Sequence, residues 1–264
     1  MNSAFYSAVS GMKSFQAELD VTANNLSNVN TTAFKASKVS FDELMKTQMD
    51  TKAEGEHLIG HGIKVGQIKT DVTAGNLLPS DSPTDFAIVG NAYFAIEGGE
   101  DEEEPLYTRD GSFQISATED GNYLTTKDGH YVLSMDGDYV ELEYKTVKGK
   151  GEREEDTNVL DLENLKDKIG LFTCDNPAGL EAAGNNRFRT SATSGEWYEV
   201  DQEEADEDEY VISNPKIIAQ ALEGSNSDIG TEMVSIIESQ RGFQLNSRIV
   251  TVADQLEEMI NNLR

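Results

Sequence analysis

Residues 245–263 read LNSRIVTVADQLEEMINNL, and apolar side chains recur in this stretch at alternating steps of four and three. The series consists of Leu245, Ile249, Val252, Leu256, Met259 and Leu263. An average spacing of 3.5 residues keeps one stripe on one side of an α-helix and is typical of a coiled coil. Because a lone helix cannot bury such a stripe, the stretch predicts a helix that packs against a partner.

The opposite end of the chain carries a second series at the same spacing. Its members are Phe5, Ala8, Met12, Phe15, Leu19, Leu26 and Val29, with Thr22 as the polar position. Each end has a stripe that it cannot bury alone. We therefore expect the two ends to pair with each other or with another chain.

Local signals set the predicted bounds of these two helices. The first is expected from about Ser3 to Asn28, and the second from residue 229 onward, with Asp228 as its cap and Glu232 in its first turn. In the early part of the second helix, Met233 and Ile236 follow a different phase from the stripe that begins at Leu245. Gly242 lies at this change of phase, where it permits either a close approach or a bend.

Asparagine is concentrated where the first helix is expected to end. Asn24, Asn25, Asn28 and Asn30 have short polar side chains that compete for backbone hydrogen bonds. Two interpretations remain open on this evidence: the run terminates the helix, or it makes hydrogen bonds between subunits.

The middle of the chain is predicted to be rich in β-strands. Four Asp-Gly dipeptides, at 110–111, 120–121, 128–129 and 136–137, separate short runs of strand-forming residues. Asp-Gly tolerates the positive φ of tight hairpin turns, so this part should form a meandering antiparallel sheet. The predicted fold class is α+β, divided into an N-terminal helix and turn (1–45), a connector (46–75), a β-rich domain (76–213) and a C-terminal helix (214–264). Within the connector, the polar residues 46–62 are expected to form a loop, and Val65, Ile68 and Val72 suggest extended structure after it.

The formal net charge is −28 over 264 residues, and the middle of the chain carries most of it. Acidic blocks at 100–104, 152–156 and 201–209 are typical of solvated surface insertions. No basic stripe is visible, which argues against nucleic acid as a partner. No stretch approaches the length of a membrane-spanning segment, so membrane insertion is not expected.

No catalytic residue, cofactor or metal site is predicted. Cys174 is the only cysteine, which excludes an intramolecular disulfide, and a buried apolar role is favoured for it over a nucleophile. His57 and His61 are four residues apart, a spacing that would let both bind one metal ion if they lay on a helix. Their glycine-rich surroundings disfavour a helix. From the residues alone, a secreted carboxylate hydrolase and a calcium-dependent adhesin remain alternatives to a self-assembling structural protein.

Three stretches resemble the flagellar rod and hook protein family. Residues 19–35, LDVTANNLSNVNTTAFK, resemble its N-terminal signature, and LEGSN at 222–226 with IESQRGFQLNS at 237–247 resembles its C-terminal signature. Between them, DFAIVGNAYF at 85–94 and YTRDGSF at 107–113 resemble the start of its central β domain. The acidic insertions at 100–104 and 201–209 depart from the family pattern.

The resemblance implies a non-enzymatic structural subunit of the bacterial flagellar basal-body rod, most like a distal-rod protein, with a proximal-rod or hook protein as the alternative. It implies self-assembly through terminal helices, torque transmission to the hook, and export by the flagellar type III apparatus without a cleaved signal. Expected partners are further copies, other rod and hook proteins, and the surrounding ring proteins. The expected assembly interface comprises Phe5, Met12, Leu19, Asn24, Asn25, Leu26, Asn28, Asn30, Phe34, Met233, Ile236, Gln240, Arg241, Leu245, Asn246, Ile249, Val252, Leu256, Met259 and Leu263.

Overall fold

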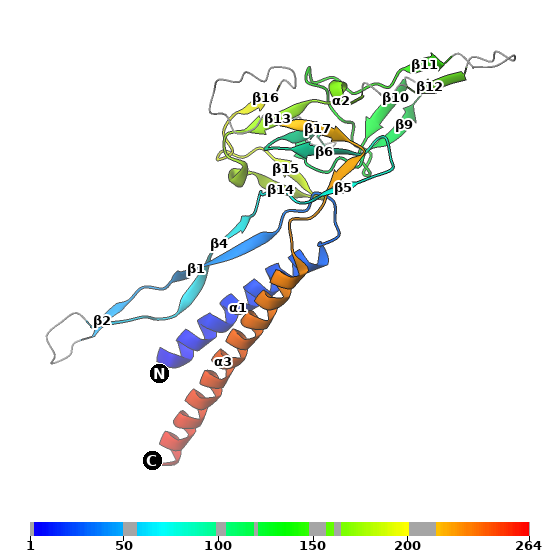
Figure 1. Cartoon of the computed structure of the whole chain (residues 1–264). Helices are drawn as coiled ribbons and strands as arrows, with labels where there is room; N and C mark the ends of the chain where they lie inside the picture. The colour runs from blue at the N-terminus through cyan, green and yellow to red at the C-terminus, as the bar shows by residue number, and fades with distance from the viewer. Residues whose placement is uncertain are drawn as a thin grey trace. The chain divides into compact units, whose positions relative to one another are not determined.

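The computed structural model describes residues 3–49, 57–98, 104–118, 121–147, 157–160, 165–200 and 215–263. The chain divides into two compact units (Figure 1). We call residues 1–29, 35–71 and 227–264 the helical unit, and residues 30–34 and 72–226 the β unit. The acidic blocks at 152–156 and 201–209 lie outside the described residues, as does all of the 100–104 block except Glu104.

Two long helices form the main part of the helical unit. Helix α1 spans Ser3–Ser27 and helix α3 spans Ile229–Asn262, which confirms the two predicted terminal helices. Asp228 caps α3 as predicted, because its side chain accepts a hydrogen bond from the backbone N–H of Thr231 at 2.9 Å.

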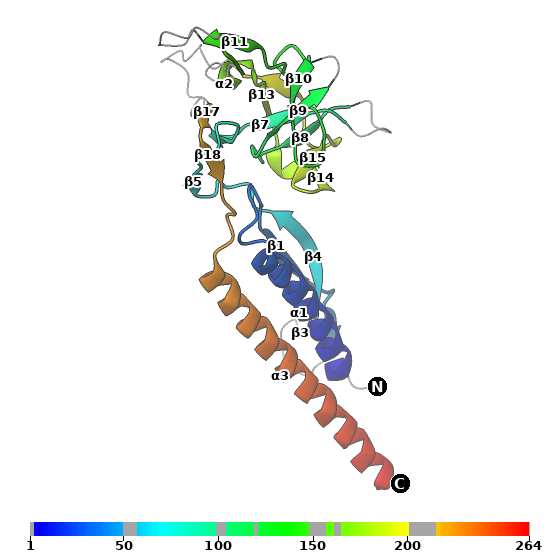
Figure 2. The same ribbon diagram turned by 90° about the vertical axis from the view of Figure 1, so that its right-hand side faces the viewer.

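Helices α1 and α3 pack side by side and antiparallel (Figures 1 and 2). Their contacts follow one register over four turns, and α3 continues beyond the start of α1. The contacts that define this register are Asn25 with Glu232, Glu18 with Ser239, Phe15 with Gly242 and Gly11 with Asn246. The predicted pairing of the two ends is therefore confirmed.

On α3, the contact surface differs from the predicted apolar stripe by about one residue along the helix, whereas on α1 it includes Phe15, a member of the predicted stripe. On α3 it includes Ser239, Gly242 and Ala253, while on α1 it includes Ala8 and Gly11. A Cβ atom added at Gly242 would lie 2.7 Å from the ring of Phe15, so any larger residue here would have to displace that ring. Small side chains allow the two backbones to come near each other, and a count of large apolar residues does not detect them.

A β-hairpin completes the helical unit. Strand β1 (Ser37–Glu43) pairs antiparallel with β4 (Ile63–Thr70), and β2 (Thr47–Met49) pairs with β3 (His57–Ile59) beyond them. The described part of 46–62, expected as a loop, therefore contains two strands, because the β1–β4 pairing brings both sides of the segment within hydrogen-bonding distance. The hairpin packs on α1, where the rings of Phe15 and Phe41 are 6.1 Å apart.

The β unit contains a six-stranded antiparallel sheet in the order β14-β15-β8-β7-β13-β16. These strands are β14 (Glu181–Gly184), β15 (Arg187–Arg189), β8 (Leu106–Thr108), β7 (Tyr93–Ile96), β13 (Leu171–Cys174) and β16 (Trp197–Glu199). Helix α2 (Leu165–Lys168) precedes β13, and a short 3-10 helix, η1 (Pro177–Gly179), follows it. Two further pairs join β6 (Phe86–Val89) with β17 (Lys216–Ala219), and β5 (Leu77–Pro79) with β18 (Ala221–Glu223).

The predicted meander is confirmed by the hairpin of β9 (Gln114–Thr118) and β10 (Gly121–Thr125) and by the bridged segments after it. Gly129 and Gly137 have φ angles of 91° and 82°, as hairpin turns require. The Asp-Gly pair at Gly111 has another role, because a Cβ there would overlap the carbonyl oxygen of Phe86. Strands β11 (Tyr144–Val147) and β12 (Thr157–Leu160) form a separate hairpin.

Two apolar clusters form the core of the β unit. The larger one includes Phe94, Leu124 and Leu171, and the smaller one surrounds Tyr93, Tyr107 and Phe188. Cys174 is buried, and burial raises the pKa of its thiol to about 11. The thiol is therefore protonated at neutral pH, in agreement with an apolar packing role.

Candidate assembly interface

The predicted C-terminal stripe lies on an open face of α3. We call Leu245, Ile249, Val252, Leu256, Met259 and Leu263 the α3 stripe. In order along the chain, these six side chains are 60%, 45%, 53%, 44%, 54% and 88% exposed. Because α3 contacts α1 through a different face, folding of the single chain leaves the α3 stripe uncovered.

The stripe is long enough to act as an interface. At about 1.5 Å of rise per residue, residues 245–263 cover about 27 Å of helix. Continuous apolar surface of this kind is rare on monomeric proteins and usually marks a binding surface. Met233, near the start of α3, is also 52% exposed, whereas Ile236 is partly buried.

The predicted apolar residues of α1 are covered to different degrees. Met12, Leu19 and Leu26 are partly buried. Phe5 is 37% exposed and packs edge-to-face on Tyr6, with ring centroids 5.6 Å apart. The start of α1 is therefore the part of this helix that offers the most apolar surface to a partner.

The asparagine residues divide between two roles inside the chain. Asn25 is buried, and its side chain accepts from the N–H of Ser37 at 2.9 Å and donates to the Ser37 carbonyl at 2.8 Å and to Glu232 Oε1 at 3.2 Å. Both donors of this amide are thus used to join α1, β1 and α3. Asn28 donates to the carbonyl and to Oδ1 of Asn24, so these two hydrogen bonds lie within the end of α1.

The remaining predicted residues lie in three places. Gln240 and Arg241 are exposed on α3, and Asn246 lies against Gly11 and donates to the Gly242 carbonyl at 3.0 Å. Asn30 and Phe34 belong to the β unit instead, since they lie in the segment 30–34. The sequence therefore grouped side chains that the fold assigns to different surfaces.

Electrostatics at the start of α3 favour an ordered helix. The backbone N–H of Thr231, and then its hydroxyl, donate to Asp228 and lower the pKa of this carboxyl below its ordinary value. The negative charge also lies at the positive end of the helix dipole. Ser239, which is 1% exposed, donates to Glu18 Oε2 at 2.8 Å and provides a polar contact between the helices.

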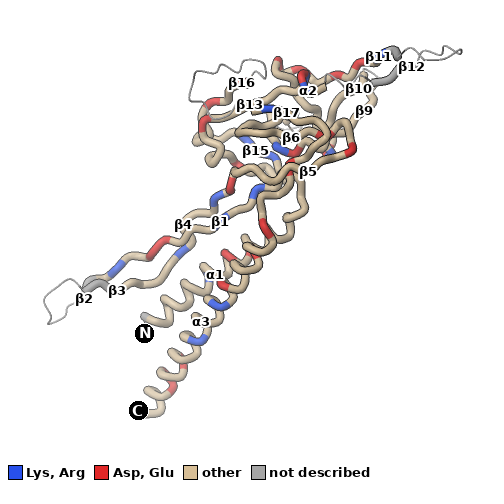
Figure 3. Tube along the Cα trace, in the orientation of Figure 1, with Lys and Arg blue, Asp and Glu red and all other residues tan. Residues whose placement is uncertain are grey.

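The described residues offer little for catalysis or cofactor binding. Within them, no group of three or more His, Cys, Asp or Glu side chains converges as metal ligands would. His61 is exposed and contacts the hydroxyl of Thr47. Figure 3 shows Lys and Arg separated along the described chain by uncharged or acidic positions. None of the described helices combines the length and the apolar character that crossing a bilayer requires.

One buried ion pair, between Arg109 and Glu223, was not predicted from the sequence. Arg109 and Glu223 are 2% and 1% exposed, and they contact each other within the β unit. Both lie in stretches that resemble family signatures, YTRDGSF and LEGSN. A charged residue within each signature was the sequence feature that could have drawn attention to this pair. The two residues are more than a hundred positions apart, so the sequence did not show that they contact each other.

Comparison with known proteins gives matches in the same three regions. Residues 5–35 match the family "Flagella basal body rod protein", residues 87–152 match "Flagellar hook protein FlgE/F/G D1 domain", and residues 218–263 match "Flagellar basal body rod FlgEFG protein C-terminal". The resemblance inferred from the sequence is therefore confirmed.

Individual relatives match over nearly the full length. The flagellar basal-body rod protein FlgG of Bacillus subtilis is 33% identical over 270 residues, covering 98% of both chains. FlgG of Borreliella burgdorferi is 32% identical over 280 residues, covering 100% of this chain and 99% of its own. The hook-basal body complex protein FlhP of Bacillus subtilis is 28% identical, with 96% of each chain covered. The chain therefore belongs to the flagellar basal-body rod protein family, as a FlgG-like, non-enzymatic structural subunit.

Proposed function

We propose that this chain is a distal-rod subunit that assembles with further copies of itself through the α3 stripe and the exposed start of α1. One observation carries the proposal: α3 is already paired with α1, yet the six apolar residues of its stripe are all at least 44% exposed. Covering this surface would remove from water apolar area that the single chain leaves exposed. A second copy of the same chain supplies the matching apolar surface.

The proposed partners beyond further copies are other rod and hook proteins and the surrounding ring proteins. Full-length similarity to several FlgG proteins supports the distal-rod subtype over a proximal-rod or hook protein. In this assembly the paired helices carry torque along the rod axis towards the hook. The predicted residue Arg241, which is exposed one turn before the stripe begins, is proposed to provide a polar contact there, and Gln240 is exposed on another side of the same turn.

Cysteine cross-linking in purified basal bodies tests the proposal. In a Cys174→Ala background, Val252→Cys places a thiol in the stripe, and Asp254→Cys places one on the other side of the same turn. We expect a short bifunctional reagent to join copies of the Val252→Cys chain into dimers and larger species. Equal cross-linking of both variants, or none in assembled rods, would contradict the proposed use of the stripe.

Export by the flagellar type III apparatus, with the N-terminus retained, is the second part of the proposal. Helix α1 begins at Ser3 and packs on α3 through Ala8 and Gly11, so removal of an N-terminal segment would delete part of the fold. Mass spectrometry of the chain from basal bodies should find peptides that contain the first turn of α1, from Ser3 onward. A shortened N-terminus, or delivery in cells without a flagellar export apparatus, would show another route.

A further inference from the structure

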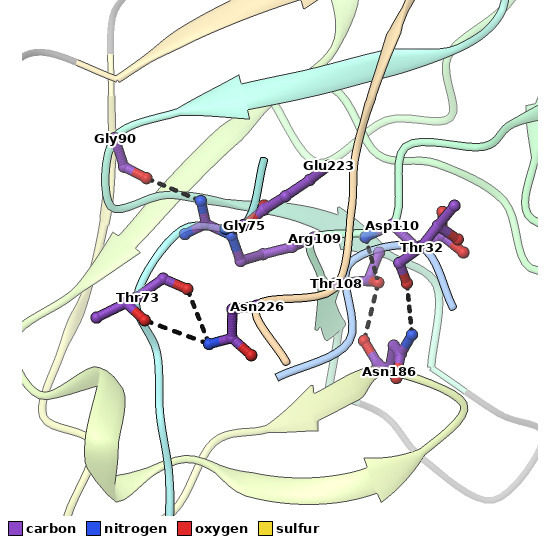
Figure 4. Close-up of polar contacts among 10 residues, drawn as sticks. All are labelled: Thr32, Thr73, Gly75, Gly90, Thr108, Arg109, Asp110, Asn186, Glu223 and Asn226. Carbon is purple, nitrogen blue, oxygen red and sulfur yellow. Dashed lines mark hydrogen bonds and ion pairs between the residues drawn. The ribbon is translucent and has the colours of Figure 1, made fainter. Parts of the chain in front are cut away.

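Arg109 and Glu223 form a buried ion pair at one end of the β unit (Figure 4). Arg109 Nε donates to Glu223 Oε2 at 2.8 Å, and Nη2 donates to the Gly90 carbonyl at 3.0 Å. The guanidinium carbon also lies 5.6 Å from the ring centroid of Tyr93. These contacts hold Glu223 at a defined position against strand β8 and the turn after β6.

Glu223 in turn binds two other segments of the chain. We call residues 30–34, 72–76 and 223–226 the first, second and third connectors. The second Glu223 carboxylate oxygen accepts from the N–H of Gly75 in the second connector at 2.8 Å. Its carbonyl oxygen accepts from the N–H of Ala33 in the first connector at 2.8 Å. One residue therefore joins all three connectors.

Asparagine side chains reinforce this arrangement. Asn226 Nδ2 donates to the carbonyl and hydroxyl of Thr73 at 3.2 and 3.3 Å, and the Asn226 N–H donates to the Phe34 carbonyl. Asn186, in the β14–β15 turn, donates to the Thr32 carbonyl at 2.7 Å. Figure 4 shows the side-chain contacts of Asn226 with Thr73 and of Asn186 with Thr32.

The second and third connectors also touch through their backbones. The N–H of Gly224 donates to the carbonyl of Asn76 at 2.8 Å, and a Cβ added at Gly75 would overlap the Gly224 carbonyl oxygen. Glycine is therefore required at position 75. The second and third connectors are therefore in direct backbone contact.

The three connectors have a common place in the chain. The chain crosses between the helical unit and the β unit at four points, after residues 29, 34, 71 and 226, and each of these points is an end of one connector. At each crossing point, the adjoining connector is therefore held by hydrogen bonds with Glu223, Asn226 or Asn186.

We propose that Arg109 and Glu223 are positioning residues that clamp the three connectors together. The connectors then act as one rigid element when they transmit load from the terminal helices to the β unit. The inference rests on the proposed rod function for its mechanical part only. The clamp itself is a property of the isolated chain. Without the ion pair, the connectors keep their covalent links but move separately, and the β unit no longer follows the helices faithfully.

Two variants separate clamping from general stability. The double variant Arg109→Met/Glu223→Leu removes both charges together, since removing one would leave a buried charge without its partner. The control Val132→Ala weakens the buried core of the β unit at a residue outside the connectors. Denaturant concentrations are adjusted so that both variants are measured at equal global stability.

The first measurement is amide hydrogen exchange on the purified full-length chain. In the double variant we expect exchange at Ala33, Gly75 and Asn226 to accelerate by at least about tenfold, while β7 and β13 keep their protection. The control should accelerate exchange in the core strands at least as much as in the connectors. Unchanged connector exchange in the double variant would overturn the clamp, and this result does not depend on assembly.

The second measurement is swimming in media of increasing viscosity. Cells with the double variant should assemble basal bodies but lose speed more steeply with viscosity than cells with Val132→Ala. Equal slopes for the two strains would overturn the mechanical role even if the connectors were loosened. Absence of the wild-type chain from the rod would instead contradict the proposed function and leave the exchange result standing.

Discussion

Replacing Leu256 with Asp puts a carboxylate into the α3 stripe without disturbing the pairing of α3 with α1. In the antiparallel register, Gly11 lies opposite Asn246, so the first residue of α1, Ser3, lies level with residue 254. Leu256 therefore belongs to the part of α3 that extends beyond α1. We expect the free energy of unfolding of the isolated variant to lie within about 0.5 kcal/mol of the wild-type value, as is usual for an exposed position.

The expected loss in assembly is much larger. Leu256 is 44% exposed, and full burial of leucine contributes about 1.5–3 kcal/mol, so covering the exposed part is worth about 1 kcal/mol per copy. An unpaired carboxylate at the same place adds a desolvation cost of several kcal/mol. A total of at least about 3 kcal/mol weakens each contact by about a hundredfold or more.

Gln255→Asp is the matched control, because it adds the same side chain to the same turn of the helix but outside the stripe. Soft-agar motility and basal-body preparations measure assembly, and urea denaturation of the purified chain measures folding. We expect Leu256→Asp to abolish rods and Gln255→Asp to leave them intact. Normal rods with Leu256→Asp, or an equal defect in both variants, would refute the role of the stripe.

Three further substitutions test the local structure. Gly242→Ala should destabilise the helix pair by up to about 2 kcal/mol, because overpacking against the Phe15 ring outweighs a gain of about 1 kcal/mol in helix propensity; increased protection of α3 in hydrogen exchange would contradict this. Ala33→Gly should stabilise the β unit by up to about 1 kcal/mol in urea denaturation, since relief of the φ of 54°, about 1–2 kcal/mol, exceeds the loss of one buried methyl group, about 0.8 kcal/mol. Because the pKa of Asp228 is lowered from 3.8, its cap should stabilise α3 fully above that pH and lose this effect as the pH falls through the lowered value. Helix content followed by circular dichroism should therefore show an acid-dependent loss in the wild-type chain that Asp228→Asn removes, since Asn caps without a charge.

Local chemistry predicted the elements that depend on neighbouring residues. The cap at Asp228, the end of α1 near Asn28 and the turns at Gly129 and Gly137 were all visible in the sequence. In each case a short polar side chain or a glycine determines the backbone conformation within a few residues. Tertiary partners change such local preferences least at the ends of helices and in tight turns.

The choice of helix face could not be predicted in this way. Large apolar residues dominate any periodic pattern, and in α3 they form the stripe that remains exposed. The face that contacts α1 uses Ser239, Gly242 and Ala253, whose side chains are small enough for close packing but add little to an apolar pattern. The pairing of Arg109 with Glu223 was hidden for another reason, because it depends on how distant strands come together.

The division of α3 into two faces has a consequence for the order of folding and assembly. The face towards α1 is stabilised by small residues and by hydrogen bonds such as that from Ser239 to Glu18. On α3 these contacts are made by small or polar side chains, whereas the large apolar side chains of the α3 stripe stay exposed and, in the proposed assembly, would be covered by another copy. If Leu245 and Val252 faced α1 instead, the single chain would bury its own stripe and the hydrophobic drive for assembly would be lost. The proposed use of the α3 stripe in assembly therefore depends on Ser239, Gly242 and Ala253, whose small side chains occupy the face towards α1 and leave the large apolar side chains exposed.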